Sequence, residues 1–121
     1  MGNVQVHKAR VLIVEDEMIV AMFVEDLLGE LGYSIAGIAS RIEDAQARAE
    51  EADFDIAILD VHINGKDVFP VADILEAKNI PMIFATGYGE RGLPDRYKGR
   101  PVLQKPYHAD DLAKVLAACQ G

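Results

Sequence analysis

Three short runs of consecutive apolar residues constrain the fold of this chain more than any other feature. They cover residues 11–14, 56–59 and 82–85, and each is followed at once by a polar residue. A strand that is apolar at every position is covered on both faces, which is typical of a parallel sheet between two layers of helices. Residues 33–39 and 101–104 have the composition of two further, shorter strands.

Segments with helical periodicity separate these runs. A first helix, which Gly32 closes, has one apolar face that consists of Val20, Phe23, Val24, Leu27, Leu28 and Leu31. Ser40 and Glu43 have the spacing of a capping box and predict the start of a second helix. The predicted inner faces are Ile42, Ala45, Ala49 and Ala52 for the second helix, Val68, Val71, Ala72 and Leu75 for the third, and Leu112, Val115, Leu116 and Cys119 for the last.

Residues 88–100 differ from the rest of the chain because they hold three glycines and one proline and have weak periodicity. A fourth helix in this segment should be short or mobile. The alternation of strands and helices predicts one doubly wound α/β domain with a parallel sheet over residues 1–121. Residues 1–8 are expected to form a flexible N-terminal extension.

Composition excludes several classes of protein. The chain has 20 acidic and 12 basic residues among 121, which argues against a nucleic-acid-binding surface. Its single cysteine allows no internal disulfide and suits a reducing compartment. The start of the chain has no apolar targeting segment, and the longest apolar run, residues 18–24, is too short to cross a bilayer. We therefore expect a cytoplasmic protein with no membrane partner.

Polar side chains follow four of the five predicted strands. Because the carboxyl ends of parallel strands meet at one edge of the sheet, these side chains should converge. Two like charges about 4 Å apart repel by roughly 4 kcal/mol at an effective dielectric constant near 20, so such a cluster needs a cation. Carboxylate oxygens favour Mg²⁺. The converging residues are Glu15 and Asp16 after the first strand, Asp60 after the third, Thr86 after the fourth and Lys105 after the fifth.

The same residues suit phosphoryl transfer, which needs a nucleophile and neutralisation of the phosphoryl oxygens. The Asp60 carboxylate is the candidate nucleophile and would form an aspartyl phosphate. Lys105 supplies a positive charge, and the Thr86 hydroxyl is placed to donate to a phosphoryl oxygen. Gly87, which has no side chain, leaves that pocket open.

This ordered set resembles the receiver domain of two-component response regulators over essentially the whole chain. The matching elements are the acidic pair, the phosphoacceptor, the threonine and the Lys-Pro dipeptide. The resemblance implies a flavodoxin-like fold with strand order 2-1-3-4-5 and Mg²⁺-dependent phosphotransfer from a sensor histidine kinase to Asp60. It further implies that Asp16, Asp60 and the His62 carbonyl bind Mg²⁺ directly, that Glu15 acts through water, and that the Lys105-Pro106 peptide is cis.

The implied function is signalling, not turnover of a substrate. A receiver catalyses its own phosphotransfer and dephosphorylation, and it either signals through protein–protein contacts with a downstream protein or phosphotransfer partner or drains phosphate from a kinase. The run Phe84-Ala85-Thr86-Gly87-Tyr88 is similar to the single-domain receivers named for their "FATGUY" motif. That group tends to have a poorly formed fourth helix and commonly works with histidine kinases of alphaproteobacteria.

One position departs from the common receiver pattern, and one group of apolar residues has two possible roles. Val102 stands where many receivers carry an aromatic switch residue, and Tyr88 or Tyr107 either replaces that aromatic or packs on the surface. Met18, Ile19 and Met22 lie off the main apolar stripe of the first helix. They either pack loosely against the core or form a docking patch for the four-helix bundle of a kinase.

Other interpretations of the same residues compete with a receiver. Glu15 and Asp16 can simply favour a helix N-terminus, and Thr86 can cap a helix. A phosphatase-like hydrolase with an aspartyl nucleophile usually has a second aspartate two residues later, where His62 stands and could instead affect attack of water. A flavin-binding module would want a phosphate-cradling loop after the first strand, and a receiver that takes no phosphate would not need the full residue set.

Overall fold

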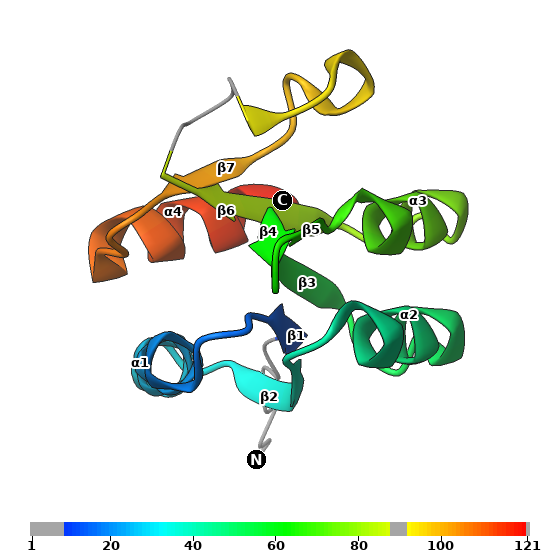
Figure 1. The fold of residues 1–121 in the computed structure, drawn as a ribbon. Coiled ribbons are helices and arrows are strands. Elements are labelled where there is room, and N and C mark those ends of the chain that lie inside the picture. The colour runs from blue at the N-terminus through cyan, green and yellow to red at the C-terminus, as the bar shows by residue number, and fades with distance from the viewer. Residues whose placement is uncertain (1–8, 88–91, 121) are drawn as a thin grey trace.

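The computed structural model describes residues 9–87 and 92–120, so the predicted extension at residues 1–8 lies outside the described part. Five parallel strands of this described part form one sheet in the order β2-β1-β3-β6-β7 (Figure 1). Since β4 and β5 belong to a separate hairpin, β6 and β7 are the fourth and fifth strands of this sheet, and the order is the predicted 2-1-3-4-5. Their bounds are β1 Arg10–Val14, β2 Ser34–Ala39, β3 Ile56–Asp60, β6 Met82–Thr86 and β7 Val102–Gln104.

In the described part of the chain, four α-helices cover the two faces of the sheet. Figure 1 shows α1 (Met18–Glu30) and α4 (Ala109–Gln120) on one face and α2 (Ile42–Glu51) and α3 (Phe69–Ala77) on the other. Two hydrophobic clusters, one on each face, fill the space between helices and sheet. The predicted flavodoxin-like α/β fold is therefore confirmed. Within the described part of the chain, no helix combines the length and apolarity needed to span a membrane.

The predicted end of the first helix is confirmed at Gly32. This glycine has a positive φ of 92°. Its N–H donates to the Gly29 carbonyl, and the Tyr33 N–H donates to the Leu28 carbonyl. This pair of bonds is the Schellman arrangement, which satisfies carbonyls that the end of a helix leaves unpaired.

The capping box predicted at Ser40 and Glu43 is wrong. The helix α2 begins one residue later than expected, with Arg41 as its N-cap and no capping bond from a side chain. Glu43 instead pairs with Lys66, whose ammonium lies 3.3 Å from the carboxylate. A cross-element ion pair has replaced the local bond that the spacing suggested.

A small antiparallel hairpin follows β3 and was not predicted. It consists of β4 (His62–Ile63) and β5 (Lys66–Asp67). Its turn residues, Asn64 and Gly65, both have positive φ, at 52° and 77°. Positive φ at both central positions defines a type I′ turn, for which Asn-Gly is a strongly preferred sequence.

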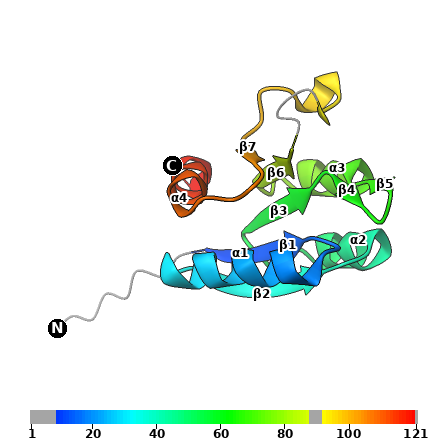
Figure 2. The same cartoon turned by 60° about the vertical axis from the view of Figure 1, so that its left-hand side comes forward.

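The segment between β6 and β7 contains no α-helix among its described residues 92–100, in agreement with the expectation of a short fourth helix. It carries the 3₁₀ turn η2 (Asp95–Tyr97), which lies at the β7 edge of the sheet (Figures 1 and 2). Tyr97 is buried, and its ring lies 5.2 Å from that of Phe84 and 5.9 Å from that of Phe69. Its hydroxyl donates to Asp73 at 2.6 Å, so the Tyr97 side chain contacts both α3 and β6.

Candidate functional site

Three carboxylates converge at the carboxyl ends of β1 and β3. In the parallel ladder between these strands Val14 lies opposite Leu59, so the residues that follow them, Glu15 and Asp60, are neighbours. Oxygen atoms of Glu15, Asp16 and Asp60 lie within 4.8 Å of one another. Glu15 is 2% exposed and Asp60 7%, whereas Asp16 is half-buried and open to solvent.

Lys105 reaches this cluster from the end of β7. Its ammonium lies 2.9 Å from Oδ2 of Asp60 and 3.4 Å from Oε1 of Glu15. The Lys105 main-chain N–H donates to the Thr86 carbonyl at 3.1 Å, which holds the lysine backbone against β6. The peptide between Lys105 and Pro106 is cis, as the resemblance to receivers implied.

Main-chain donors orient each of the three carboxylates. The His62 N–H donates to Oδ1 of Asp60 at 3.3 Å, and the Glu17 N–H donates to Oε2 of Glu15 at 3.1 Å. The Asn64 N–H donates to Oδ2 of Asp16 at 2.8 Å. These bonds fix the side chains of a cluster whose charges repel one another.

Burial and charge shift two pKa values in the cluster. Burial, followed by a hydrogen bond with Asp60, raises the pKa of Glu15 to about 7. Burial lowers the pKa of Lys105, but the hydrogen bond and charge of Asp60 outweigh it and leave the pKa above its ordinary value. One ammonium therefore does not compensate for all the buried negative charge.

This imbalance predicts a pH-dependent stability in the presence of EDTA. In the folded protein the pKa of Glu15 is about 7, above its ordinary value of 4.5. The contribution of Glu15 to the free energy of unfolding is therefore fully present below pH 4.5 and is lost as the pH rises through 7. The difference in free energy of unfolding between Glu15→Gln and the wild type should therefore change by on the order of 1–2 kcal/mol in favour of the variant as the pH rises from 5 to 8. Urea denaturation of both proteins at several pH values measures this, and parallel stability curves would contradict it.

Thr86 ends β6 and is buried beside the cluster, because its neighbour Ala85 lies opposite Asp60 in the ladder. The His62 imidazole does not join the carboxylates. It is exposed, and its Nδ1 lies 3.2 Å from Asp67 across the hairpin. The backbone of His62 thus lies near Asp60, and its ring points away from the carboxylate cluster. The binding of a metal by the His62 carbonyl stays a prediction.

Val102 and the aromatic residues Tyr97 and Tyr107 lie in two different core clusters. Val102 packs against the core cluster that contains Tyr97, on the α2–α3 face. Tyr107 is buried in the cluster on the opposite face and is therefore not packed on the surface. Tyr88 lies outside the described residues. Sequence reasoning missed Tyr97 because a single 3₁₀ turn has no periodicity to reveal its buried side.

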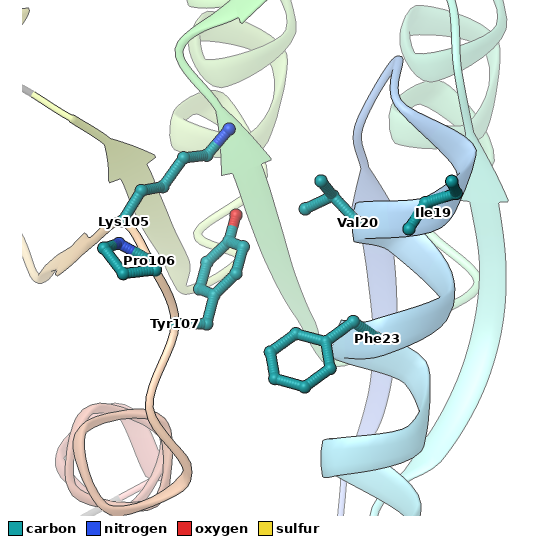
Figure 3. Close-up of a pocket in the computed structure, with 6 residues that line it drawn as sticks. All are labelled: Ile19, Val20, Phe23, Lys105, Pro106 and Tyr107. Carbon is teal, nitrogen blue, oxygen red and sulfur yellow. The ribbon is translucent and has the colours of Figure 1, made fainter.

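An exposed apolar area on α1 lies next to the cluster. This α1 patch consists of Met18, Ile19, Met22 and Phe23, of which Ile19 is 84% exposed. Phe23 was expected on the buried face, but it is 48% exposed. A cavity of about 250 Å³ adjoins the patch (Figure 3), with Ile19, Val20 and Phe23 on one side and Lys105, Pro106 and Tyr107 on the other. The groove therefore runs from the α1 patch to the lysine of the site.

Known proteins are similar to this chain in sequence and fold. Residues 11–117 match the model of the response regulator receiver domain. The structure of SdrG from Sphingomonas melonis Fr1 is 42% identical, with a TM-score of 0.85, over 97% of this chain and all of SdrG. The receiver domain of PhyR from Erythrobacter litoralis is 29% identical, with a TM-score of 0.80, over 93% of this chain and 90% of that domain.

Curated relatives are longer proteins. The transcriptional regulatory protein PdtaR of Mycobacterium tuberculosis is 34% identical over 88% of this chain and 54% of its own length. The phyllosphere-induced regulator PhyR of Methylorubrum extorquens is 30% identical over 88% of this chain and 42% of its own length. The chain thus spans about half the length of the curated relatives it matches. With the family match over most of its residues, the chain belongs to the response regulator receiver domain family of two-component signalling.

Proposed function

We propose that Asp60 accepts a phosphoryl group from a phosphohistidine of a sensor histidine kinase. The observation that carries this proposal is the Lys105 ammonium, 2.9 Å from the Asp60 carboxylate within a cluster of acidic side chains. A carboxylate at a strand end, next to a fixed cation and near the surface, is a suitable nucleophile for phosphoryl transfer.

The transfer exchanges one bond to phosphorus for another. A carboxylate oxygen of Asp60 attacks the phosphorus atom, a P–O bond forms, and the P–N bond to the donor imidazole breaks. The imidazole leaves with the electron pair of that bond. Lys105 compensates the charge on the phosphoryl oxygens, and the Thr86 hydroxyl donates a hydrogen bond to one of them.

The donor set fits Mg²⁺. The converging side-chain atoms of Glu15, Asp16 and Asp60 are all carboxylate oxygens, and within the described residues one lysine, Lys105, faces them. In this proposal Asp16, Asp60 and the His62 carbonyl bind the ion directly, while Glu15 acts through water. When bound, Mg²⁺ would supply positive charge for the phosphoryl oxygens.

The α1 patch is proposed to dock the kinase. Its four exposed apolar side chains form a continuation of the groove that ends at Lys105. An apolar helix face beside a groove suits packing against the helices of a four-helix bundle. We further propose that residues 1–121 form a cytoplasmic receiver whose output is a protein–protein contact or the draining of phosphate from the kinase.

Lys105→Ala is expected to leave the fold intact and to weaken the response to phosphorylation. The side chain is half-buried at the edge of the cluster, so its removal opens no core cavity. Without the ammonium, the bond between the phosphoryl group and β7 is lost. The shift of the Thr86 amide signal in NMR on addition of beryllofluoride and Mg²⁺ should fall by more than half. Lys78→Ala, which changes an exposed lysine after α3, is the control.

A Thr86 shift in Lys105→Ala equal to that of the wild type would contradict the proposed role of the lysine. An absent shift in the wild type itself would contradict the switching of this domain by phosphorylation.

A further inference from the structure

The β4–β5 hairpin touches both of the carboxylates proposed to bind the divalent cation directly. Its first residue donates a main-chain N–H to Asp60, and its turn residue Asn64 donates a main-chain N–H to Asp16. We propose that Asn64 is a positioning residue that holds the Asp16 carboxylate in place for the cation. This inference rests on the proposed function.

The main-chain N–H of Asn64 faces Asp16 from the turn of the hairpin. Residue 64 has a φ of 52°, in the left-handed region that asparagine tolerates better than most side chains. In this conformation its N–H lies 2.8 Å from Oδ2 of Asp16. The side-chain amide Nδ2 donates to the Ser40 carbonyl at 3.1 Å, so the same residue also ties the hairpin to the loop before α2.

The base of the hairpin is fixed independently of its turn. Ile63 is fully buried in the core. Lys66 pairs with Glu43 on α2, and His62 pairs with Asp67 across the two strands. Because Ile63 anchors the base in the core, the position of the Asn64 N–H depends on the turn conformation and on the bond to Ser40.

The orientation of the Asp16 carboxylate depends strongly on the Asn64 N–H, because Asp16 has fewer other contacts than Glu15 and Asp60. Glu15 and Asp60 are buried and both contact Lys105. Asp16 is half-buried, and across residues 9–87 and 92–120 its carboxylate accepts a hydrogen bond from Asn64 alone. A ligand that is held before the ion arrives loses less freedom on binding, and loss of an outer partner typically weakens metal affinity 10–100-fold.

The test is Asn64→Ala, with Asn79→Ala as the matched control. Asn79 also has a positive φ, of 58°, but it follows α3 and makes no contact with the cluster. Alanine tolerates the left-handed region less well than asparagine, so both variants should lose similar stability to urea in EDTA. At position 64 the turn also loses the side-chain bond to Ser40, so its conformation changes and the main-chain N–H moves away from Asp16. Titration with MgCl₂ followed by NMR should show about 10-fold weaker binding for Asn64→Ala and wild-type binding for Asn79→Ala.

Asn64→Gly adds a second arm: both variants of residue 64 keep the main-chain N–H, but glycine, unlike alanine, adopts positive φ without strain and so preserves the turn. It should recover most of the Mg²⁺ affinity that Asn64→Ala loses. The inference is overturned if Asn64→Ala binds Mg²⁺ as the wild type does, if Asn79→Ala weakens binding equally, or if Asn64→Gly stays as weak as Asn64→Ala. A wild-type chain that binds no Mg²⁺ would instead overturn the proposed metal site.

Discussion

Asp60→Asn is expected to gain no phosphoryl group from a small phosphodonor under conditions in which the wild type gains one. The amide of asparagine has nearly the shape of the carboxylate but lacks its negative charge, so the nucleophile is lost while the packing stays. The residue is buried among Glu15, Lys105 and the His62 N–H, which can all remain in place. Intact-mass spectrometry measures the gain directly.

Asp111→Asn serves as the control for this experiment. It makes the same chemical change at an exposed aspartate in the first turn of α4. It should be phosphorylated as the wild type is. An equal mass gain in Asp60→Asn and the wild type would show that another residue accepts the group.

The second large effect concerns stability. Tyr97→Ala is expected to lower the free energy of unfolding by about 3–5 kcal/mol, because it empties a buried site between Phe69, Phe84 and α3. Tyr97→Phe removes only the hydroxyl that donates to Asp73 and should cost about 1 kcal/mol. The two variants separate the packing of the ring from the hydrogen bond, and urea denaturation measures both.

Phe23→Ala is the control, because it removes an aromatic ring from a partly exposed position. Phe23 is 48% exposed on α1, so its removal should cost far less than the removal of Tyr97. If Tyr97→Ala and Phe23→Ala have similar effects, Tyr97 does not anchor the segment around η2 to the core.

The strands and the convergence of the site could be predicted because they follow from local composition. Strands buried on both faces leave continuous apolar runs, and β1, β3 and β6 were recognised in this way. The residue after such a run lies at the edge of the sheet whatever the rest of the chain does. The positions of Glu15, Asp60 and Lys105 near one another therefore required only the strand assignment and the topology.

Features that depend on contacts between distant segments could not be predicted. Glu43 has the spacing of a capping residue, but Lys66 attracts it across the structure. Phe23 fits the apolar period of α1, yet it points beyond the edge of the core. The hairpin had a local signal in Asn64-Gly65, but its strands are only two residues long and have no alternation to recognise.

The most direct measurement is to locate the phosphoryl group in the wild-type chain. The protein is incubated with a small phosphodonor with Mg²⁺ or with EDTA, and the product is mapped by tandem mass spectrometry. We predict one phosphoryl group, on the peptide that contains Asp60, in the Mg²⁺ sample and little or none with EDTA. A group on any other residue, or none in either sample, would contradict the assignment of Asp60 as the phosphoacceptor.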